Sequence, residues 1–260
     1  MAQVGGRGRQ VQIVCVAIVL LVAASLFDAP PSSASEGSAT PTDSKSSADP
    51  EREPEEPDPV EPAESQEPDD KPGGKVIYLT FDDGPWAGHT RRVLELLDEY
   101  DAKATFFQVG EEAAARPELT RAVVAPGHAL GSHTWNHKDL RKLSRRAVSH
   151  QITRTSAVLG RISGRPITCL RPPYGAKNAR VMSVIRSKKL AMKLWDIDPR
   201  DWKKPGASVI ARRVISKAHP GAVVLMHDGG GNRSQSVKAL KRILQALTTK
   251  GYRFETLPGC

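Results

Sequence analysis

The sequence predicts an α/β fold, a distorted and incomplete (β/α) barrel of about seven parallel strands with helices outside them. The first observation behind this prediction is that short apolar runs alternate with amphipathic helical patterns after residue 74, as in folds whose parallel sheet is covered by helices. The second observation is the number of elements. Seven strand patterns and six helix patterns in about 185 residues are too few for a full eight-fold barrel. An open doubly wound sheet is the alternative, and both folds bind ligands at the C-terminal ends of their strands.

Each expected element has its own signal in the sequence. The strand patterns are short runs of apolar and β-branched residues, at 75–81, 103–109, 128–134, 166–171, 190–197, 221–227 and 252–257. The helical patterns repeat apolar residues at three- and four-residue spacing, at 89–100, 111–124, 144–161, 177–188, 207–218 and 234–249. Val93 and Leu97 lie on one such apolar face, and Gly164 and Gly251 mark helix ends. Together they define a domain over residues 75–260.

The first 27 residues do not belong to this domain. Arg7 and Arg9 precede an apolar run from Val11 to Phe27, and basic residues before an apolar segment are typical of export signals and membrane anchors. The 17-residue run is long for a removed signal and short for a membrane span. A cleaved signal and a single-pass anchor both stay open, with the anchor favoured. In either case we expect the rest of the chain outside the cytoplasm.

Residues 28–74 are expected to form a disordered acidic linker. They are rich in Pro, Ser, Glu and Asp and lack aromatic residues, a composition that buries too little apolar surface to offset the entropy of ordering. Charge divides sharply at this boundary. Residues 36–71 carry thirteen acidic residues and three basic ones, whereas residues 72–260 carry 33 Lys and Arg against 15 Asp and Glu. The formal net charge of +9 therefore hides a strongly basic domain on an acidic linker.

A basic domain favours an anionic partner. For an exported protein we expect phosphate-bearing wall polymers or anionic lipid surfaces as that partner, and no nucleic acid. A surface whose excess charge is simply solvated is the alternative. We expect the protein to act as a monomer.

Two cysteines of the domain have no role assigned by the patterns above. In an oxidising compartment Cys169 and Cys260 could pair, which would join the end of the chain to the strand before Arg171. The sequence leaves this pairing open, because it does not show whether the geometry permits a bond.

Metal-binding residue types follow two of the predicted strands. Asp82 and Asp83 end the first strand, just before a Gly-Pro turn, and His133 and His137 follow the third at a spacing of one helical turn. Two imidazoles and one carboxylate form a three-ligand site for a divalent ion such as zinc. We therefore expect Asp83, His133 and His137 to hold a metal. Two surface histidines and a plain turn are the alternative interpretation.

Proton transfer needs further groups at the same edge of the sheet. Asp82, next to the ligand Asp83, suits a general base, and Arg171, held by two prolines, is placed to pair with it. His227, at the end of the apolar strand 221–227, suits a general acid if a carboxylate orients its ring. Asp198 is the expected carboxylate. Structural roles at strand ends are the alternative for Arg171 and His227.

Five short motifs occur in a fixed order along the domain: TFDDGP at 80–85, HTWNH at 133–137, RPPYG at 171–175, DPRDW at 198–202 and LMHD at 225–228. With them, residues 75–257 resemble the polysaccharide deacetylase family, carbohydrate esterase family 4 with its NodB-homology domain. The bacterial peptidoglycan and chitooligosaccharide deacetylases are the most similar members. The fold of the family is a distorted (β/α) barrel with fewer than eight full strands, and no motif position departs from the family pattern.

The resemblance implies a role for each motif residue. Asp82 would be the general base held by Arg171, and His227 the general acid held by Asp198. Asp83, His133 and His137 would bind Zn²⁺, with Co²⁺, Mn²⁺ or Ni²⁺ as alternatives. The backbone N–H of Tyr174 would stabilise an oxyanion, and Trp202 and Leu225 would line the groove for the acetyl methyl group.

The implied reaction is hydrolysis of an N-acetyl group on a β-1,4-linked amino sugar. Export, the linker and the basic domain favour cell-wall peptidoglycan as the substrate, through its N-acetylglucosamine or N-acetylmuramic acid. A chitooligosaccharide deacetylase and an acetylxylan esterase remain alternatives, because the five motifs do not separate them. A non-catalytic module that binds wall glycan is an alternative of another class, although Asp82 and His227 are both present.

Overall fold

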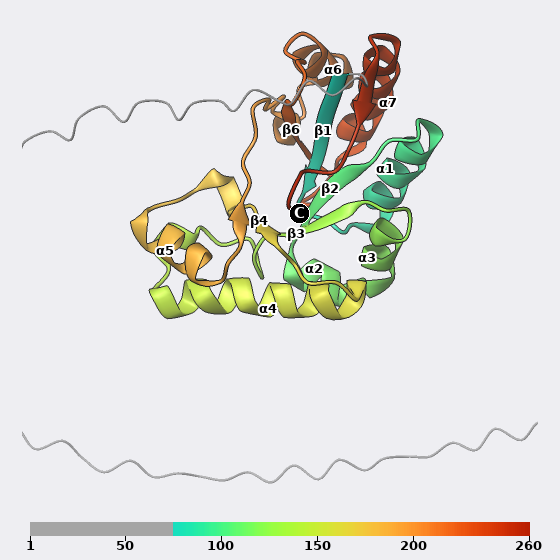
Figure 1. The fold of residues 1–260 in the computed structure, drawn as a ribbon. Helices are drawn as coiled ribbons and strands as arrows, with labels where there is room; N and C mark the ends of the chain where they lie inside the picture. The colour runs from blue at the N-terminus through green and yellow to red at the C-terminus, as the bar shows by residue number, and fades with distance from the viewer. Residues whose placement is uncertain (1–74) are drawn as a thin grey trace, which may run out of the picture. The chain divides into compact units, whose positions relative to one another are not determined.

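The computed structural model describes residues 75–260 (Figure 1). The predicted signal or anchor segment, 1–27, and the predicted linker, 28–74, lie outside the described residues. Among residues 75–260, none of the helices combines the length and the apolar character that a membrane crossing needs.

The domain is built on a seven-stranded parallel sheet, as the sequence predicts. The strands are β1 (Lys75–Asp82), β2 (Ala104–Gln108), β3 (Ala129–Ser132), β4 (Cys169–Leu170), β5 (Ala191–Met192), β6 (Val223–His227) and β7 (Tyr252–Phe254). Their order is β5-β4-β3-β2-β1-β6, and β7 pairs with the first residues of β1. A bridge between Ile197 and Val224 then joins the chain beyond β5 to β6. This bridge brings the two edges of the sheet together, which gives a distorted barrel.

Seven α-helices lie outside the strands in the described part of the chain, with α6 and α7 beside β1 and β6 (Figure 1). They are α1 (Ala87–Glu99), α2 (Gly110–Ala115), α3 (Pro117–Val124), α4 (Arg145–Ser163), α5 (Ala179–Ser187), α6 (Ala207–Ile215) and α7 (Ser234–Thr249). Short 3₁₀ helices span Leu140–Lys142, Pro173–Gly175 and Asp201–Lys203. The helix expected at 111–124 is two helices, because Pro117 lacks an N–H and forces Arg116 out of helical geometry (φ −137°, ψ 60°).

Two strands are much shorter than the patterns at 166–171 and 190–197 predict. β4 and β5 pair over two residues each, and the ladder ends at Leu170 and Met192. Just beyond β5, the carbonyls of Lys193 and Leu194 accept hydrogen bonds from the Arg171 guanidinium, at 3.3 and 2.7 Å. These carbonyls thus bond to an arginine side chain where a regular sheet would bond them to the backbone of a neighbouring strand, and the sheet becomes irregular at this point.

Successive side chains of β1 point alternately into the hydrophobic core and into the barrel interior. Ile77, Leu79 and Phe81 are fully buried and belong to the main core cluster, which β1, β2 and β6 form with α1, α6 and α7. Thr80 and Asp82 point to the other face, as strand geometry requires, and both contact Arg171. β1 therefore carries core residues on one face and polar groups inside the barrel on the other.

A disulfide bond joins Cys169 of β4 to the C-terminal Cys260. The pairing that the sequence leaves open is therefore made in the structure. Cys169 is fully buried and packs with Phe107 and Leu257, so the bond fixes the end of the chain against β4.

Candidate active site

The predicted site residues gather at the C-terminal ends of the strands, around one pocket of about 400 Å³. The residues that line it are Asp82, Asp83, His133, His137, Tyr174, Trp195, Asp198, Trp202, Leu225, His227 and Arg233. The parallel register explains this convergence, since Asp82 at the end of β1 lies beside His227 at the end of β6 and Phe107 near the end of β2. Nine of the ten residues predicted for the site line this pocket, and the tenth, Arg171, is hydrogen-bonded to Asp82.

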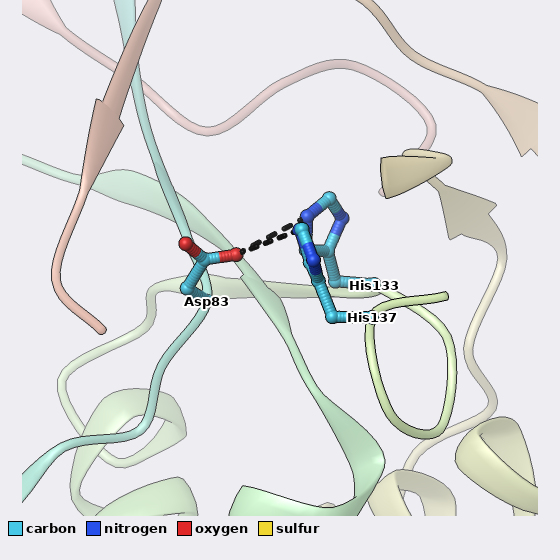
Figure 2. A group of neighbouring side chains, drawn as sticks. All are labelled: Asp83, His133 and His137. Carbon is cyan, nitrogen blue, oxygen red and sulfur yellow. Dashed lines mark ion pairs between the residues drawn. The ribbon is translucent and has the colours of Figure 1, made fainter. Parts of the chain in front are cut away.

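Asp83, His133 and His137 form a cluster that could hold a metal ion (Figure 2). Asp83 Oδ1 lies 3.5 Å from His133 Nε2 and 3.2 Å from His137 Nε2, and the three ligand atoms are all within 4.8 Å of one another. Among the described residues this oxygen has no hydrogen-bond partner, although it is buried. A buried carboxylate oxygen facing two imidazole nitrogens fits a divalent ion of the zinc type.

The loops that carry these ligands adopt left-handed backbone conformations. Asp82 still belongs to the β1 ladder, whereas Asp83 has a φ of 75° and leaves it. The prediction that His133 and His137 share a helical turn is wrong. The segment between them is a loop in which Thr134 and His137 have φ values of 68° and 56°, and this loop brings the two rings to a centroid distance of 5.0 Å.

The electrostatics of the cluster favour a cation. Burial on its own would raise the pKa of Asp83, but the imidazole of His133 at 3.5 Å, with attraction from His227 and His137, lowers it. Burial alone would lower the pKa of His133, but attraction to Asp82 and Asp83 outweighs it and raises the pKa. Two carboxylates therefore concentrate negative charge at the place where the imidazoles meet.

Arg171 organises both the predicted base and a predicted ligand. Its buried guanidinium donates to Asp82 Oδ1 at 2.8 Å and to Thr80 Oγ1 at 2.7 Å. Its backbone carbonyl accepts a hydrogen bond from Nδ1 of His133 at 2.8 Å, which leaves Nε2 of that ring free to face Asp83. One residue thus orients the carboxylate of Asp82 and the ring of His133.

The carboxylate that orients His227 is Asp201, so the prediction of Asp198 is wrong. Asp201 accepts hydrogen bonds from Nδ1 of His227 at 2.7 Å, from its backbone N–H at 2.9 Å and from Ser236 Oγ at 2.6 Å. Asp198 instead accepts from the backbone N–H of Arg200 at 2.7 Å. An Asp before Pro199-Arg200 is a typical residue for such a turn, and this signal distinguishes the two acids.

His227 is held in its protonated form. Burial would lower its pKa, but the hydrogen bond and attraction from Asp201, with attraction from Asp82 and Asp83, raise the pKa to about 9. A protonated imidazole that faces a pocket can donate a proton to a leaving group at neutral pH.

Arg233 is a site residue that the sequence analysis does not single out. It is almost fully buried and donates to the carbonyls of Gly229 and Gly230, at 2.6 and 3.0 Å. One of its terminal nitrogens lies 3.8 Å from Oδ2 of Asp83. A Cβ on Gly230 would come within 2.5 Å of that oxygen, so glycine is needed here. The Gly229-Gly230-Gly231 run after His227-Asp228 was the available signal for a loop in close contact with the site.

The pocket opens between aromatic side chains. Tyr174 and Trp202 are 68% and 46% exposed, and Leu225 forms part of the wall from β6. Tyr174 has a φ of 61° and lies edge-on to His137, with ring centroids 4.8 Å apart. Trp195, which the sequence analysis also leaves out, lines the pocket and lies against Gly175, where a Cβ would be 2.9 Å from its ring.

Comparison with known proteins shows the family of the chain. Residues 69–193 match the profile of a family described as polysaccharide deacetylase. The chain is 36% identical to a chitooligosaccharide deacetylase of Azorhizobium caulinodans, over 70% of this chain and 92% of that protein. The chain belongs to the polysaccharide deacetylase family.

Other members of the polysaccharide deacetylase family are similarly close. A peptidoglycan-N-acetylglucosamine deacetylase of Bacillus cereus is 39% identical, over 70% of this chain and 86% of that protein. The solved structure of the peptidoglycan deacetylase PdaC of Bacillus subtilis superposes with a TM-score of 0.67 at 37% identity, over 72% of this chain and 90% of that one. The family resemblance and the predicted barrel are therefore confirmed, and this polysaccharide deacetylase lies close to both chitooligosaccharide and peptidoglycan deacetylases.

Proposed function

We propose that this protein hydrolyses N-acetyl groups on amino sugars of a β-1,4-linked glycan, with the N-acetylglucosamine of cell-wall peptidoglycan as its target. One observation carries the proposal. The Asp83–His133–His137 cluster lies in a single pocket with two oriented proton-transfer groups, Asp82 and His227. Hydrolysis of an amide requires an activated water, a base and an acid around one carbonyl.

Asp83, His133 and His137 would hold the metal ion. Zn²⁺ suits two imidazoles and a carboxylate, and Co²⁺, Mn²⁺ and Ni²⁺ accept the same donors. When bound, such an ion polarises a carbonyl oxygen and lowers the pKa of water. The chain's own contribution is to fix the three donors, through the carbonyl of Arg171 on His133 and the loop of Arg233 beside Asp83.

The other residues move protons and stabilise charge. Asp82, oriented by Arg171, accepts the proton of the attacking water as the new C–O bond forms. The backbone N–H of Tyr174 stabilises the oxyanion, a contribution of about 10²–10³ in rate for one donor. His227, held by Asp201, donates its proton to the sugar nitrogen as the C–N bond breaks. The products are acetate and a free amine.

The wall of the pocket suits an acetylated sugar. Trp202 and Leu225 provide apolar surface for the acetyl methyl group, and exposed aromatic rings at the opening offer faces on which a sugar can pack. Relatives named as peptidoglycan and as chitooligosaccharide deacetylases are about equally similar to the chain. We favour peptidoglycan because the N-terminal segment and the basic domain suit a protein exported to the cell wall, either anchored in the membrane or secreted. In this proposal the protein acts as a monomer.

Acetate release tests the proposal. The purified zinc-loaded protein is incubated with peptidoglycan, chitooligosaccharides and acetylxylan side by side, with Asp82→Asn as the inactive control. We expect release to be fastest from peptidoglycan, to stop with a chelator and to be lost in the variant. Release from acetylxylan alone would make the protein an O-acetyl esterase. No release from any acetylated glycan would support a glycan-binding module instead.

A further inference from the structure

A groove lies beside the active-site pocket and shares two lining residues with it. It has a volume of about 580 Å³ and is lined by His137, Lys138, Asp139, Arg141, Lys142, Leu143 and Tyr174. His137 and Tyr174 also line the active-site pocket. Their edge-to-face rings, 4.8 Å apart, form the boundary that the two spaces have in common. The groove and the active-site pocket thus lie on either side of this residue pair.

The side chains of the groove are mainly basic. Lys138 and Lys142 are exposed and form no ion pair among residues 75–260. Arg141, by contrast, is paired with Asp139 at 2.9 Å. The remaining positive charge is that of Lys138 and Lys142, so we call this space the lysine groove.

The backbone beneath these lysines is firmly held. Asp139 caps the 3₁₀ helix Leu140–Lys142 by accepting from the N–H of Arg141 at 3.0 Å. Leu140 is fully buried in the cluster that α4 and α5 form with β4. Arg180 of α5 donates to the carbonyl of Arg141 at 2.8 Å. The positions of Lys138 and Lys142 relative to His137 are thus set by the fold.

We propose that the lysine groove binds a carboxylate on the sugar next to the one that is deacetylated. This inference rests on the proposed function and specifies its substrate as a glycan whose neighbouring sugar is acidic. Peptidoglycan strands carry carboxylates on alternate sugars, through a lactyl group or the peptide attached to it, whereas chitooligosaccharides carry none. The chemistry of the groove therefore favours the acidic glycan, and the lysines act on specificity and not on the bond-breaking step.

Matched substrates test this proposal. A peptidoglycan-derived tetrasaccharide with free carboxylates is compared with the same tetrasaccharide after conversion of its carboxylates to methyl amides. The zinc-loaded full chain is compared with the double variant Lys138→Ala/Lys142→Ala. Lys238→Ala serves as the control, since Lys238 of α7 is exposed, has no ion pair within the described domain and lies outside both spaces. Acetate release gives kcat/KM, and calorimetry on Asp82→Asn gives the dissociation constant without turnover.

We expect the wild-type chain to prefer the free carboxylate by about tenfold in both measurements, which corresponds to about 1.4 kcal/mol and to two partly exposed ion pairs. The double variant should reduce this preference to about twofold or less, while Lys238→Ala should keep it in full. A wild-type protein without the preference, or a double variant that retains it, would overturn the proposal. Acetate release without the preference would refute the lysine groove and keep the deacetylase. Preferential binding without any acetate release would refute the deacetylase and keep the groove.

Discussion

His227 and Asp201 make a two-point contact in which one carboxylate accepts hydrogen bonds from both the ring Nδ1 and the backbone N–H of the histidine, at 2.7 and 2.9 Å. Asp201 is almost fully buried and also accepts from Ser236 Oγ. The contact fixes the ring plane and leaves Nε2 as the nitrogen that can serve the pocket. It also keeps the imidazole charged, because the buried carboxylate favours the protonated ring.

Replacing Asp201 by Asn should therefore change the pH dependence of the enzyme. A general acid works only while it is protonated, so kcat/KM falls as the pH rises through the pKa of His227. With the pKa raised to about 9, this basic limb lies near pH 9 in the wild type. In Asp201→Asn the limb should move toward about pH 6.5, the ordinary value for histidine, and kcat should fall about 10²-fold.

Asp198→Asn is the matched control for this experiment, because Asp198 lines the same pocket but its carboxylate accepts from the backbone N–H of Arg200 and not from His227. Its pH–rate profile should keep the basic limb of the wild type. A limb that moves in Asp198→Asn and stays in place in Asp201→Asn would restore the assignment made from the sequence.

Asp82→Asn should separate the base from the metal ligands. Asp82 pairs with Arg171 and does not belong to the three-residue cluster, so the variant should bind zinc at the wild-type stoichiometry. Turnover should fall by about 10²–10⁴, the usual contribution of a positioned base. Atomic absorption and acetate release on the same sample measure both quantities. If zinc were lost and the rate survived, the roles of Asp82 and Asp83 would be reversed.

Arg233 should influence metal affinity although it is not a ligand. Its guanidinium lies 3.8 Å from Oδ2 of Asp83 and ties down the loop at Gly229 and Gly230. Outer groups of this kind typically change metal affinity by 10–100-fold. We expect Arg233→Met to weaken zinc binding about tenfold in a chelator competition and to alter the visible spectrum of the cobalt-loaded protein.

Arg233→Lys should recover part of that affinity, because its ammonium can still donate to the carbonyls of Gly229 and Gly230 and hold the loop beside Asp83. Thermal unfolding of both variants separates a local effect from a general loss of stability. Wild-type zinc affinity in Arg233→Met would show that the arginine has no part in positioning Asp83 for the metal.

Much of the fold follows from local patterns, and the exceptions have identifiable causes. The apolar runs predict the seven strands because a buried parallel strand needs little beyond apolar residues of the right length. The shortened β4 and β5 depend on Arg171 donating to Lys193 and Leu194. A contact made by a side chain across the barrel leaves no mark on the periodicity of either strand.

The candidate site, like the fold, is predictable only in part from the sequence. The clustering of Asp83, His133 and His137 is predicted from their residue types and their places at strand ends, and the structure confirms it. Which of the two acids, Asp198 or Asp201, faces His227 depends on the 3₁₀ helix Asp201–Lys203. The position of Arg233 beside Asp83 depends on the path of the glycine loop to which it is bound. Both are long-range relationships that spacing alone does not encode. The roles of these residues in catalysis stay predictions.

The disulfide should contribute strongly to stability. It closes a loop between residues that are 91 positions apart, and the loss of a native disulfide typically costs about 2–5 kcal/mol. Cys260→Ser should lower the free energy of unfolding by about 3 kcal/mol, and reduction of the wild type should have a similar effect. Urea unfolding with and without a reductant measures both. An unfolding midpoint that neither change moves would show that the bond does not form in solution.

The metal centre is the claim on which the rest of the account depends, and anomalous diffraction at the zinc edge tests it most directly. Crystals grown with zinc should show one anomalous peak bounded by Asp83 Oδ1 and the Nε2 atoms of His133 and His137, at about 2.0–2.2 Å from each. A zinc peak elsewhere in the domain, or none at these residues in crystals of active protein, would contradict the account.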